Sequence, residues 1–325
     1  MTEQNNTGHD VKTFIASCRM GEAQHSNNVT VIPLLSELVI GNGYTLLQEG
    51  IETGKVQVVE VTESGHIPEL KVVNELDNDV IILEGEELIG AKQNRIVNVT
   101  LIIGSRRTVV IPVSCVEQGR WRYSRADFKV GSSHPYVDLR RKKTKAVTNS
   151  LRDNNSFVAD QGEIWRDISM KAQRFSVHSE TGAMQNIFEK AGDRIQESEE
   201  NFTISSPDQV GFVVLINGKV VGCDIFGSKE VIAKVHKRLL KGYLLDAAER
   251  DFGRRGHKTT EDTQNPYEKV KTFLEMLSGA KLWSHPSLGE GTDMRFEEKK
   301  LTGFALIHKE QVVHLAAFVE PNPAL

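Results

Sequence analysis

The sequence predicts an α+β protein with a β-rich N-terminal half, a helical middle and two C-terminal hairpins packed with helices. Three observations support this class. Short runs of Val, Ile and Thr recur between residues 29 and 116, separated by turn residues. After Asp138, apolar residues instead recur three or four positions apart, which is the helical spacing. Two late segments, near residues 211 and 303, carry the apolar–turn–apolar pattern of hairpins.

The β-rich part is expected over residues 28–137. Its strand-like runs cover residues 29–34, 56–61, 70–73, 80–83, 96–103 and 108–113. Short strands at this spacing are typical of a sandwich or a partly open barrel rather than of repeated strand–helix–strand units. A short helix that ends at Gly54 is expected among them. Residues 1–27 are polar, and we expect them to be loosely ordered.

The remaining part, residues 138–320, is expected to begin with helices and to end with the hairpins. Thr181 has the residue type of an N-cap, and residues 194–201 read as a solvated helix end. Asn217-Gly218 predicts a tight turn, and Ser228 a cap for an amphipathic helix. A polar loop at residues 253–266, a helix at residues 267–277 and the second hairpin follow. The two hairpins match at a constant offset, as a weak repeat or as neighbours in one sheet.

Composition narrows the class of protein. The chain has 325 residues, 39% of them hydrophobic, and a net charge of -4, so nucleic acid is not expected as a partner. No run is long and apolar enough for a membrane span, and the N-terminus lacks the pattern of a secretory signal. The three cysteines do not form a disulfide framework. We therefore expect a cytoplasmic protein with one domain over residues 28–320.

Residues 84–95, Glu-Gly-Glu-Glu-Leu-Ile-Gly-Ala-Lys-Gln-Asn-Arg, contain the densest group of polar side chains between apolar runs. Lys92 and Arg95 are suited to anionic groups, and Gln93 and Asn94 to carbonyl and amide edges of bases or sugars. We expect the two glycines to bend the segment, so that Lys92 and Arg95 converge with a carboxylate on a solvent-connected pocket. The alternative is a solvated turn whose charges pair with one another.

Carboxylates in and after this segment are the catalytic candidates. Glu86, Glu87 and Glu117 could act as general acid or base, or hold a divalent cation, the one cofactor that the sequence suggests. Arg120 and Trp121 follow Glu117 and could clamp and stack on a ring, or merely cover the edge of the core.

Other reactive residues favour structural roles. Cys115 shares a strand face with apolar residues, which predicts a buried and inert thiol. The basic run at residues 140–143 and the loop at residues 254–258 contain no interleaved aromatic residue, so solvated faces are expected. Asp224, His314 and Tyr243 are expected to be structural.

Two blocks, Leu83 to Arg95 and Ile111 to Trp121, resemble the ADP-ribosylglycohydrolase-and-rhodanese-phosphatase-associated protein domain family. Residues 161–165, 181–183 and 222–227 add to the resemblance, which spans residues 29–318. Cys223 departs from the small residue expected there. The resemblance implies a link to ADP-ribose and nicotinamide dinucleotide metabolism, and it assigns no catalytic residue.

Two functions follow as expectations. The first is the binding, with processing left open, of a nucleotide or ADP-ribose-like anionic ligand in metabolism or defence. The second is a non-enzymatic regulatory or scaffold module that docks a partner protein through residues 84–95. A second copy of the chain is also an open partner.

Overall fold

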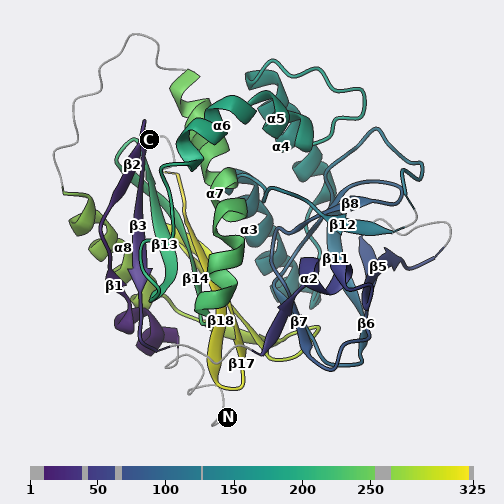
Figure 1. The fold of residues 1–325 in the computed structure, drawn as a ribbon, viewed down its shortest axis with the longest axis horizontal. Helices are drawn as coiled ribbons and strands as arrows, with labels where there is room; N and C mark the ends of the chain where they lie inside the picture. The colour runs from purple at the N-terminus through teal and green to yellow at the C-terminus, as the bar shows by residue number, and fades with distance from the viewer. Residues whose placement is uncertain (1–10, 39–42, 63–67, 126, 253–264, 322–325) are drawn as a thin grey trace. The chain divides into compact units, whose positions relative to one another are not determined.

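The computed structural model describes residues 11–38, 43–62, 68–125, 127–252 and 265–321. The chain divides into two compact units, each described below by itself. The first comprises residues 1–42, 193–286 and 292–325, and the second comprises residues 43–192 and 287–291. The single domain expected over residues 28–320, with parts at residues 28–137 and 138–320, stays a prediction. The predicted α+β class is confirmed (Figure 1).

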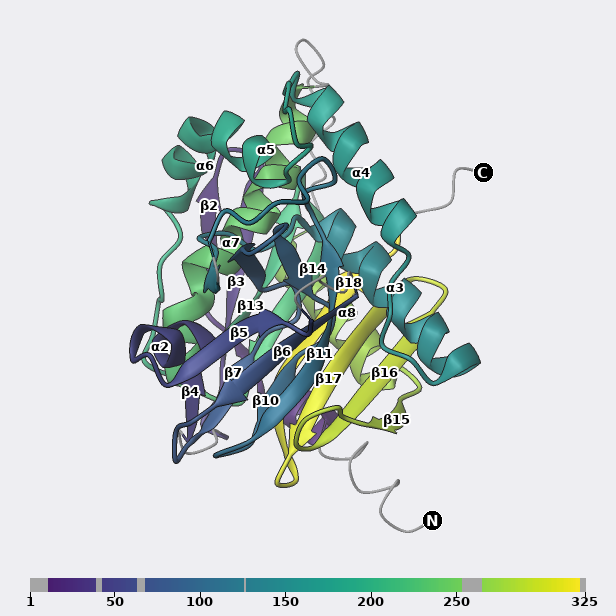
Figure 2. The ribbon, with the colours of Figure 1, turned by 90° about the vertical axis from the view of Figure 1, so that its right-hand side faces the viewer.

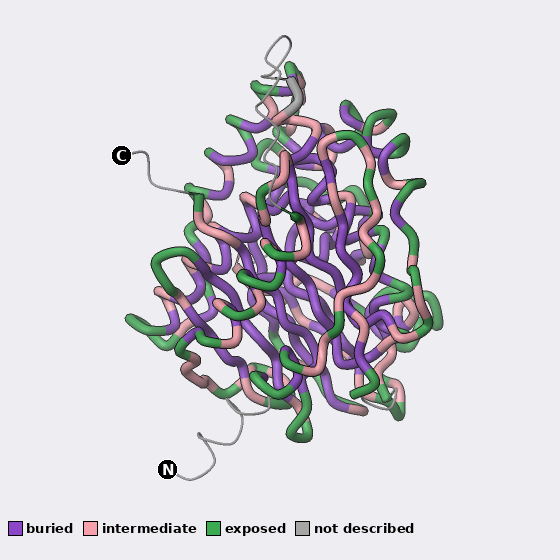
Figure 3. Tube along the Cα trace, turned by 90° about the vertical axis from the view of Figure 1, so that its left-hand side faces the viewer, coloured by how far each residue is buried: buried purple, intermediate pink, exposed green. Residues whose placement is uncertain are grey.

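The described part of the first unit holds one nine-stranded antiparallel sheet, in the order β1-β3-β13-β14-β18-β17-β16-β15, with β2 also paired to β3. Its strands are β1 (Arg19–Met20), β2 (Gln24–Ser26), β3 (Val29–Leu35), β13 (Gln209–Ile216), β14 (Lys219–Phe226), β15 (Trp283–Pro286), β16 (Thr292–Glu298), β17 (Leu301–His308) and β18 (Gln311–Val319). Figure 3 shows that the buried stretches of the chain run along the strands, while the exposed stretches are mostly loops.

Helices cover both faces of this sheet. One core cluster contains Val213 and Cys223 of the sheet together with Phe273 of α8 (Pro266–Gly279) and residues of the helical segment 11–17. The long helix α7 (Lys229–Phe252) packs on β13 and β14. Since Cys223 and Asp224 point to opposite faces, and Tyr243 of α7 bonds Asp224, α7 lies on the other face.

Asp224, His314 and Tyr243 form a fully buried polar group on that second face. The Tyr243 hydroxyl donates to Asp224 Oδ2 at 2.9 Å, and His314 Nε2 lies 3.2 Å from Asp224 Oδ1. The ring of Phe226 stacks on His314 with a centroid distance of 4.3 Å. Hydrogen bonding satisfies the polar atoms that burial removes from water, which fits the structural role expected for the three residues.

The described part of the second unit contains a three-stranded sheet, β10-β7-β4, and a six-stranded sheet, β12-β8-β9-β11-β6-β5. The strands are β4 (Tyr44–Leu46), β5 (Val56–Glu60), β6 (Glu69–Asn74), β7 (Asp79–Ile82), β8 (Glu87–Gly90), β9 (Arg95–Val97), β10 (Leu101–Ile103), β11 (Thr108–Cys115) and β12 (Phe128–Val130). Since β5 also contacts β12, the six-stranded sheet is nearly closed and barrel-like. Figure 2 shows its strands β5, β6 and β11, which are neighbours in the sheet.

The described helices of this unit, apart from α2, lie in the predicted helical middle. They are α2 (Leu47–Glu52), α3 (Val137–Asn154), α4 (Gln161–Arg174), α5 (Gln185–Lys190) and the first residue of α6 (Gly192–Glu199). Asp160 caps α4, because its side chain accepts a hydrogen bond from the Glu163 amide at 2.9 Å. The helix α4 packs on β11, and this contact brings Gln161 to the candidate site.

Several local expectations are confirmed. The helix α2, the Asn217-Gly218 turn with its two positive φ angles, and the Ser228 cap of α7 all match the sequence pattern. The two hairpins are neighbours in one sheet.

Other local expectations differ from the structure. The strand of Val29–Leu35 pairs with β13 in the first unit instead of joining the barrel-like sheet. Residues 11–26, expected to be loosely ordered, form a helix and two strands. Thr181 does not cap α5, whose N-cap is Met184. Most of the expected loop, residues 253–264, lies outside the described residues.

Candidate functional site

The segment Glu84–Arg95 is two tight turns around the short strand β8, and it ends at the first residue of β9. Gly85 and Gly90 have positive φ angles of 82° and 148°. A side chain at Gly90 would clash, because its Cβ would lie 2.2 Å from the Asp127 carbonyl oxygen. The glycines bend the segment as expected, but the bend turns it inward. All of its residues are buried except Ile89 and Lys92, which are half-buried.

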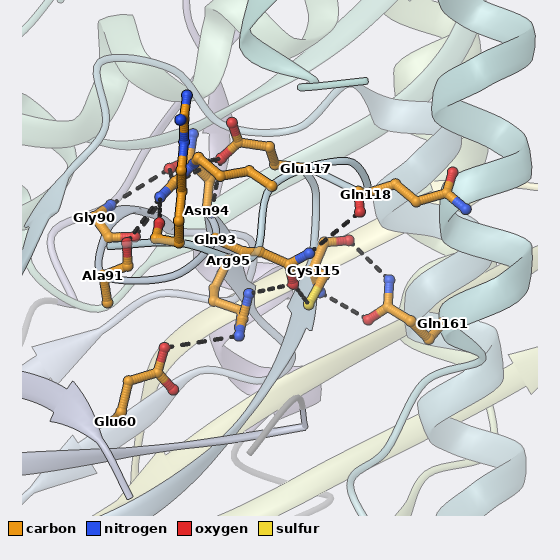
Figure 4. Close-up of polar contacts among 12 residues, drawn as sticks. Glu60, Gly90, Ala91, Gln93, Asn94, Arg95, Cys115, Glu117, Gln118 and Gln161 are labelled. Atoms are coloured by element: carbon orange, nitrogen blue, oxygen red, sulfur yellow. Dashed lines mark hydrogen bonds and ion pairs between the residues drawn. The ribbon is translucent and has the colours of Figure 1, made fainter. Parts of the chain in front are cut away.

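Arg95 and Gln93 belong to a buried network around Cys115 (Figure 4). The amide oxygen of Gln93 accepts hydrogen bonds from Arg95 and from the Cys115 thiol, both at 2.9 Å. Gln161 of α4 bonds the amide and the carbonyl of Cys115 at 2.7 and 2.8 Å. Burial raises the pKa of Cys115 to about 11, which outweighs the nearby Arg95 charge. Cys115 is therefore buried and protonated, as the strand parity predicts.

Arg120, Glu117 and Asn94 form a second network at the same bend. Glu117 Oε2 accepts hydrogen bonds from the Asn94 amide at 3.2 Å and from Arg120 Nε at 2.8 Å. The Arg120 guanidinium also donates to the carbonyl oxygens of Gly90 and Ala91 and to the side chain of Asn94. These bonds direct the Arg120 guanidinium onto the backbone of residues 90–91, so that it holds the bend in place.

Glu87 is a buried carboxyl group of the site whose hydrogen-bonding capacity is not satisfied by the described residues. It is 1% exposed, and neither carboxylate oxygen has a hydrogen-bond partner among the described residues. Burial, followed by the charges of Glu117 and Glu189, raises the pKa of Glu87 to about 8. Its carboxyl group therefore holds a proton at neutral pH. Glu86 differs, since its side chain accepts a hydrogen bond from the Leu83 amide within its own turn.

Glu84 faces the helix α3. Its carboxylate pairs with Arg140 Nε at 2.9 Å and with Lys143 Nζ at 2.5 Å, and all three side chains are at most 1% exposed. Burial works to raise the pKa of Glu84, but the charges of Lys143 and Arg140 outweigh it and hold that pKa below its usual value. The expectation of a solvated basic run at residues 140–143 is wrong, because α3 packs this part of its surface inward. The other basic segment, residues 254–258, lies outside the described residues.

Lys92, Trp121 and Tyr123 form the solvent-facing part of the site. The Lys92 ammonium lies 5.4 Å from the centroid of the Trp121 ring and 5.3 Å from that of Tyr123. The Arg95 guanidinium carbon lies 5.7 Å from the same Trp121 ring. Trp121 and Tyr123 are 47% and 51% exposed, respectively. Two cations therefore share one aromatic side chain whose outer surface is open to solvent.

The structure brings the sequence-derived candidates together, but at different depths. Lys92, Trp121 and part of Arg120 reach the surface, whereas the other candidates are buried. Those buried candidates are Glu86, Glu87, Gln93, Asn94, Arg95 and Glu117. Arg95 was expected to line a solvent-connected pocket. It is fully buried instead and does not reach solvent.

Three residues of the site were missed from the sequence. Tyr123 had a signal, since it follows Trp121 by two positions within an Arg-rich stretch. Gln161 starts a predicted helix, but nothing in its spacing predicted a bond to Cys115. Glu60, whose carboxylate lies 3.9 Å from the Arg95 guanidinium, had no local signal because it comes from a distant strand.

The described residues also bear on the expectations about metal binding and membrane spans. The described residues contain no group of three or more His, Cys, Asp or Glu side chains that could hold a metal ion. None of the helices described there has the length and apolar character needed to span a membrane.

Comparison with known proteins finds one family model that covers most of the chain. The family model described as ARG and Rhodanese-Phosphatase-superfamily-associated Protein domain matches residues 17–318, which include the whole candidate site. Neither the curated proteins nor the solved structures contain a match.

Proposed function

The chain belongs to the family of ARG and Rhodanese-Phosphatase-superfamily-associated Protein domains, and from this premise we propose that it binds a nucleotide or an ADP-ribose-like anionic ligand. The ligand combines a flat base with phosphate groups, and the binding surface consists of Lys92, Trp121 and Tyr123.

The observation that carries this proposal is the pair of cations on the Trp121 ring. Lys92 and Arg95 both lie within 6 Å of its centroid. An exposed indole offers a face for a base to stack on, and a neighbouring ammonium offers charge to a phosphate. A ligand that carries both groups satisfies both features at once.

Arg95, which is buried beneath Trp121, also favours an anionic ligand. Its Nε and one terminal nitrogen have no hydrogen-bond partner among the described residues, and the Glu60 carboxylate is 3.9 Å away. A buried donor without an acceptor costs about 1–3 kcal/mol. The Arg95 guanidinium behind Trp121, whose ion pair with Glu60 is as long as 3.9 Å, therefore adds positive potential towards a bound anion.

The buried residues take supporting roles in this proposal. Gln93 orients Arg95, while Asn94 and Glu117 fix Arg120 and thereby the loop that bears Trp121. A site of this kind depends on a rigid support around the groups that touch the ligand.

Glu87 is the residue that would carry acid chemistry if the bound ligand is also processed. Its pKa of about 8 leaves a proton available at neutral pH, which is the state required of a general acid. Glu117 is less suited, because its carboxylate already accepts bonds from Asn94 and Arg120.

The scaffold function remains a second proposal, but residues 84–95 offer it little surface. Within this segment, Ile89 and Lys92 are half-buried and all other residues are buried. Protein docking requires a contiguous exposed patch, usually several hundred Å² on each partner. We therefore favour the small anionic ligand.

Calorimetric titration of the full chain with ADP-ribose, ADP and AMP tests the proposal. We expect Lys92→Ala to weaken binding by about 1.5–3 kcal/mol, the scale of a lost hydrogen bond to a charged group. The matched control is Lys55→Ala, which removes an exposed lysine before β5 and should leave binding unchanged. Equal binding by the parent and the Lys92 variant, or no binding of any of the three compounds, contradicts the proposal.

A further inference from the structure

Residues 118–125, Gln-Gly-Arg-Trp-Arg-Tyr-Ser-Arg, form an exposed loop in which aromatic and basic residues alternate. The loop has three arginines and no acidic residue. Each of its residues is exposed except Arg120, which is half-buried and fixed by Glu117. We name residues 118–125 the aromatic loop. Arg120 and Arg125 pair with Glu117 and Asp127, so Arg122 and the neighbouring Lys92 are the cations that the loop offers to a ligand.

The aromatic loop offers two ring faces rather than one. Trp121 and Tyr123 are separated by a single residue, and both contact the Lys92 ammonium at nearly equal distances. Lys92 thus lies close to both rings. Successive bases of a strand carry one phosphate between them, which matches two rings with one cation between them.

The exposure of Trp121 and Tyr123 leaves room for a ligand longer than one nucleotide. Small-molecule sites usually bury most of the ligand surface in a concavity. Here Trp121 and Tyr123 are each about half exposed to solvent. Proteins that bind single strands instead use open aromatic platforms beside positive charge, and they gain affinity over several nucleotides.

We propose that the aromatic loop binds single-stranded nucleic acid. Trp121 and Tyr123 stack on two successive bases, Lys92 contacts the phosphate between them, and the exposed Arg122 contacts a flanking phosphate. Arg125 contributes less, because it already pairs with Asp127 at 2.8 Å. This partner goes beyond the nucleotide proposed above and reverses the expectation drawn from the net charge of -4. It uses the same surface but does not require that a free nucleotide binds.

Fluorescence anisotropy with the full chain tests the proposal. The probes are labelled single strands of 4, 8 and 12 nucleotides, as oligo(dT), oligo(dA) and oligo(U), together with a 12-base-pair duplex. The variants are Trp121→Ala, Tyr123→Ala, Trp121→Phe and Arg122→Ala. The matched control is Arg106→Ala, which removes an exposed arginine outside the loop. Because the altered residues are exposed, circular dichroism and the unfolding midpoint should show that each variant is folded.

We expect single strands to bind more tightly with length up to 8 nucleotides, and more tightly than the duplex. Each ring-to-Ala change should weaken binding about 5- to 100-fold, the range for the loss of one stacked base. Trp121→Phe should retain most of the affinity, and Arg106→Ala should have no effect. Comparison of the DNA and RNA strands shows whether the sugar is read.

Three results would overturn the inference: no binding of any strand at low salt, equal binding of duplex and single strand, or full affinity in both ring variants. Competition by poly-glutamate without any effect of the ring variants would indicate an acidic peptide instead. A parallel titration with AMP and ADP-ribose separates the two proposals. Strands that bind while these compounds do not would contradict only the small-ligand proposal, and the reverse would contradict only the single-strand inference.

Discussion

Glu87 and Cys115 show how burial acts on two acids of the same site. Removal from water disfavours the charged form of each, so both pKa values rise. For Cys115 this suppresses reactivity, because the thiolate is the nucleophile. For Glu87 it brings the pKa close to neutrality, where a carboxyl group can exchange a proton. The same physical cause therefore removes one candidate from catalysis and makes the other suitable for it.

The raised pKa of Glu87 predicts a pH dependence of stability. In the folded state this pKa rises from 4.5 to about 8. Between these values the folded protein keeps a proton that the unfolded chain releases. The Glu87 contribution to stability is therefore fully present below pH 4.5, and is lost as pH rises to about 8. The slope is at most about 1.4 kcal/mol per pH unit.

Urea unfolding between pH 5.5 and 9 measures this effect. Glu87→Gln should flatten the decline, so that the variant gains on the parent as pH rises. Glu163→Gln, at an exposed position on α4, is the control and should follow the parent curve. Parallel curves for the parent and Glu87→Gln would show that Glu87 is ionised throughout this range.

At the scale of elements, α3 illustrates what a sequence pattern conveys and what it omits. Helical spacing predicted α3 close to its observed start at Val137. The pattern could not show that Arg140 and Lys143 point inward, because basic side chains are buried only where a partner meets them. That partner, Glu84, comes from a turn on another part of the chain.

The Glu84 pairing predicts that α3 depends on one buried carboxylate. Glu84→Gln should destabilise the protein by about 3–5 kcal/mol, because two buried cations lose their counter-ion. Asp153→Asn removes an exposed carboxylate from the same helix and should change stability by less than about 0.5 kcal/mol. Chemical unfolding of both variants at pH 7 makes the comparison. Similar small losses would mean that solvent already screens the Glu84 pairs.

Strand pairing also shows that a sequence pattern does not identify a partner that is distant along the chain. The strand at Val29–Leu35 was predicted from its Val and Ile residues, yet its partner β13 was not, since alternation reveals a face and not a neighbour. Turn chemistry was more informative where both partners are local, as at Asn217-Gly218. The candidate site follows this rule. Its local residues were predicted, while Glu60 and Gln161 arrive from other elements.

At the scale of the whole molecule, segments that are far apart in the sequence belong to one compact unit of the fold. The first unit is assembled from residues on both sides of the second, because β3 pairs with β13 across the whole of residues 43–192. Composition alone predicted that residues 1–27 are polar and loosely ordered. The structure instead places Val11, Phe14 and Ile15 in the core cluster, and pairs β1 and β2 with β3.

Deletion of residues 1–27 should therefore destabilise the first unit strongly. The loss of Val11, Phe14 and Ile15 alone removes about 1.5–3 kcal/mol for each buried side chain. Their sum is comparable with the 5–15 kcal/mol that typically holds a domain folded. The deletion also leaves one edge of β3 without its partners, which favours aggregation. Deletion of residues 1–9, which removes none of these contacts, is the control. Solubility, the urea midpoint and amide exchange in β13 measure the outcome. An unchanged midpoint in the longer deletion would show that this segment does not hold the sheet.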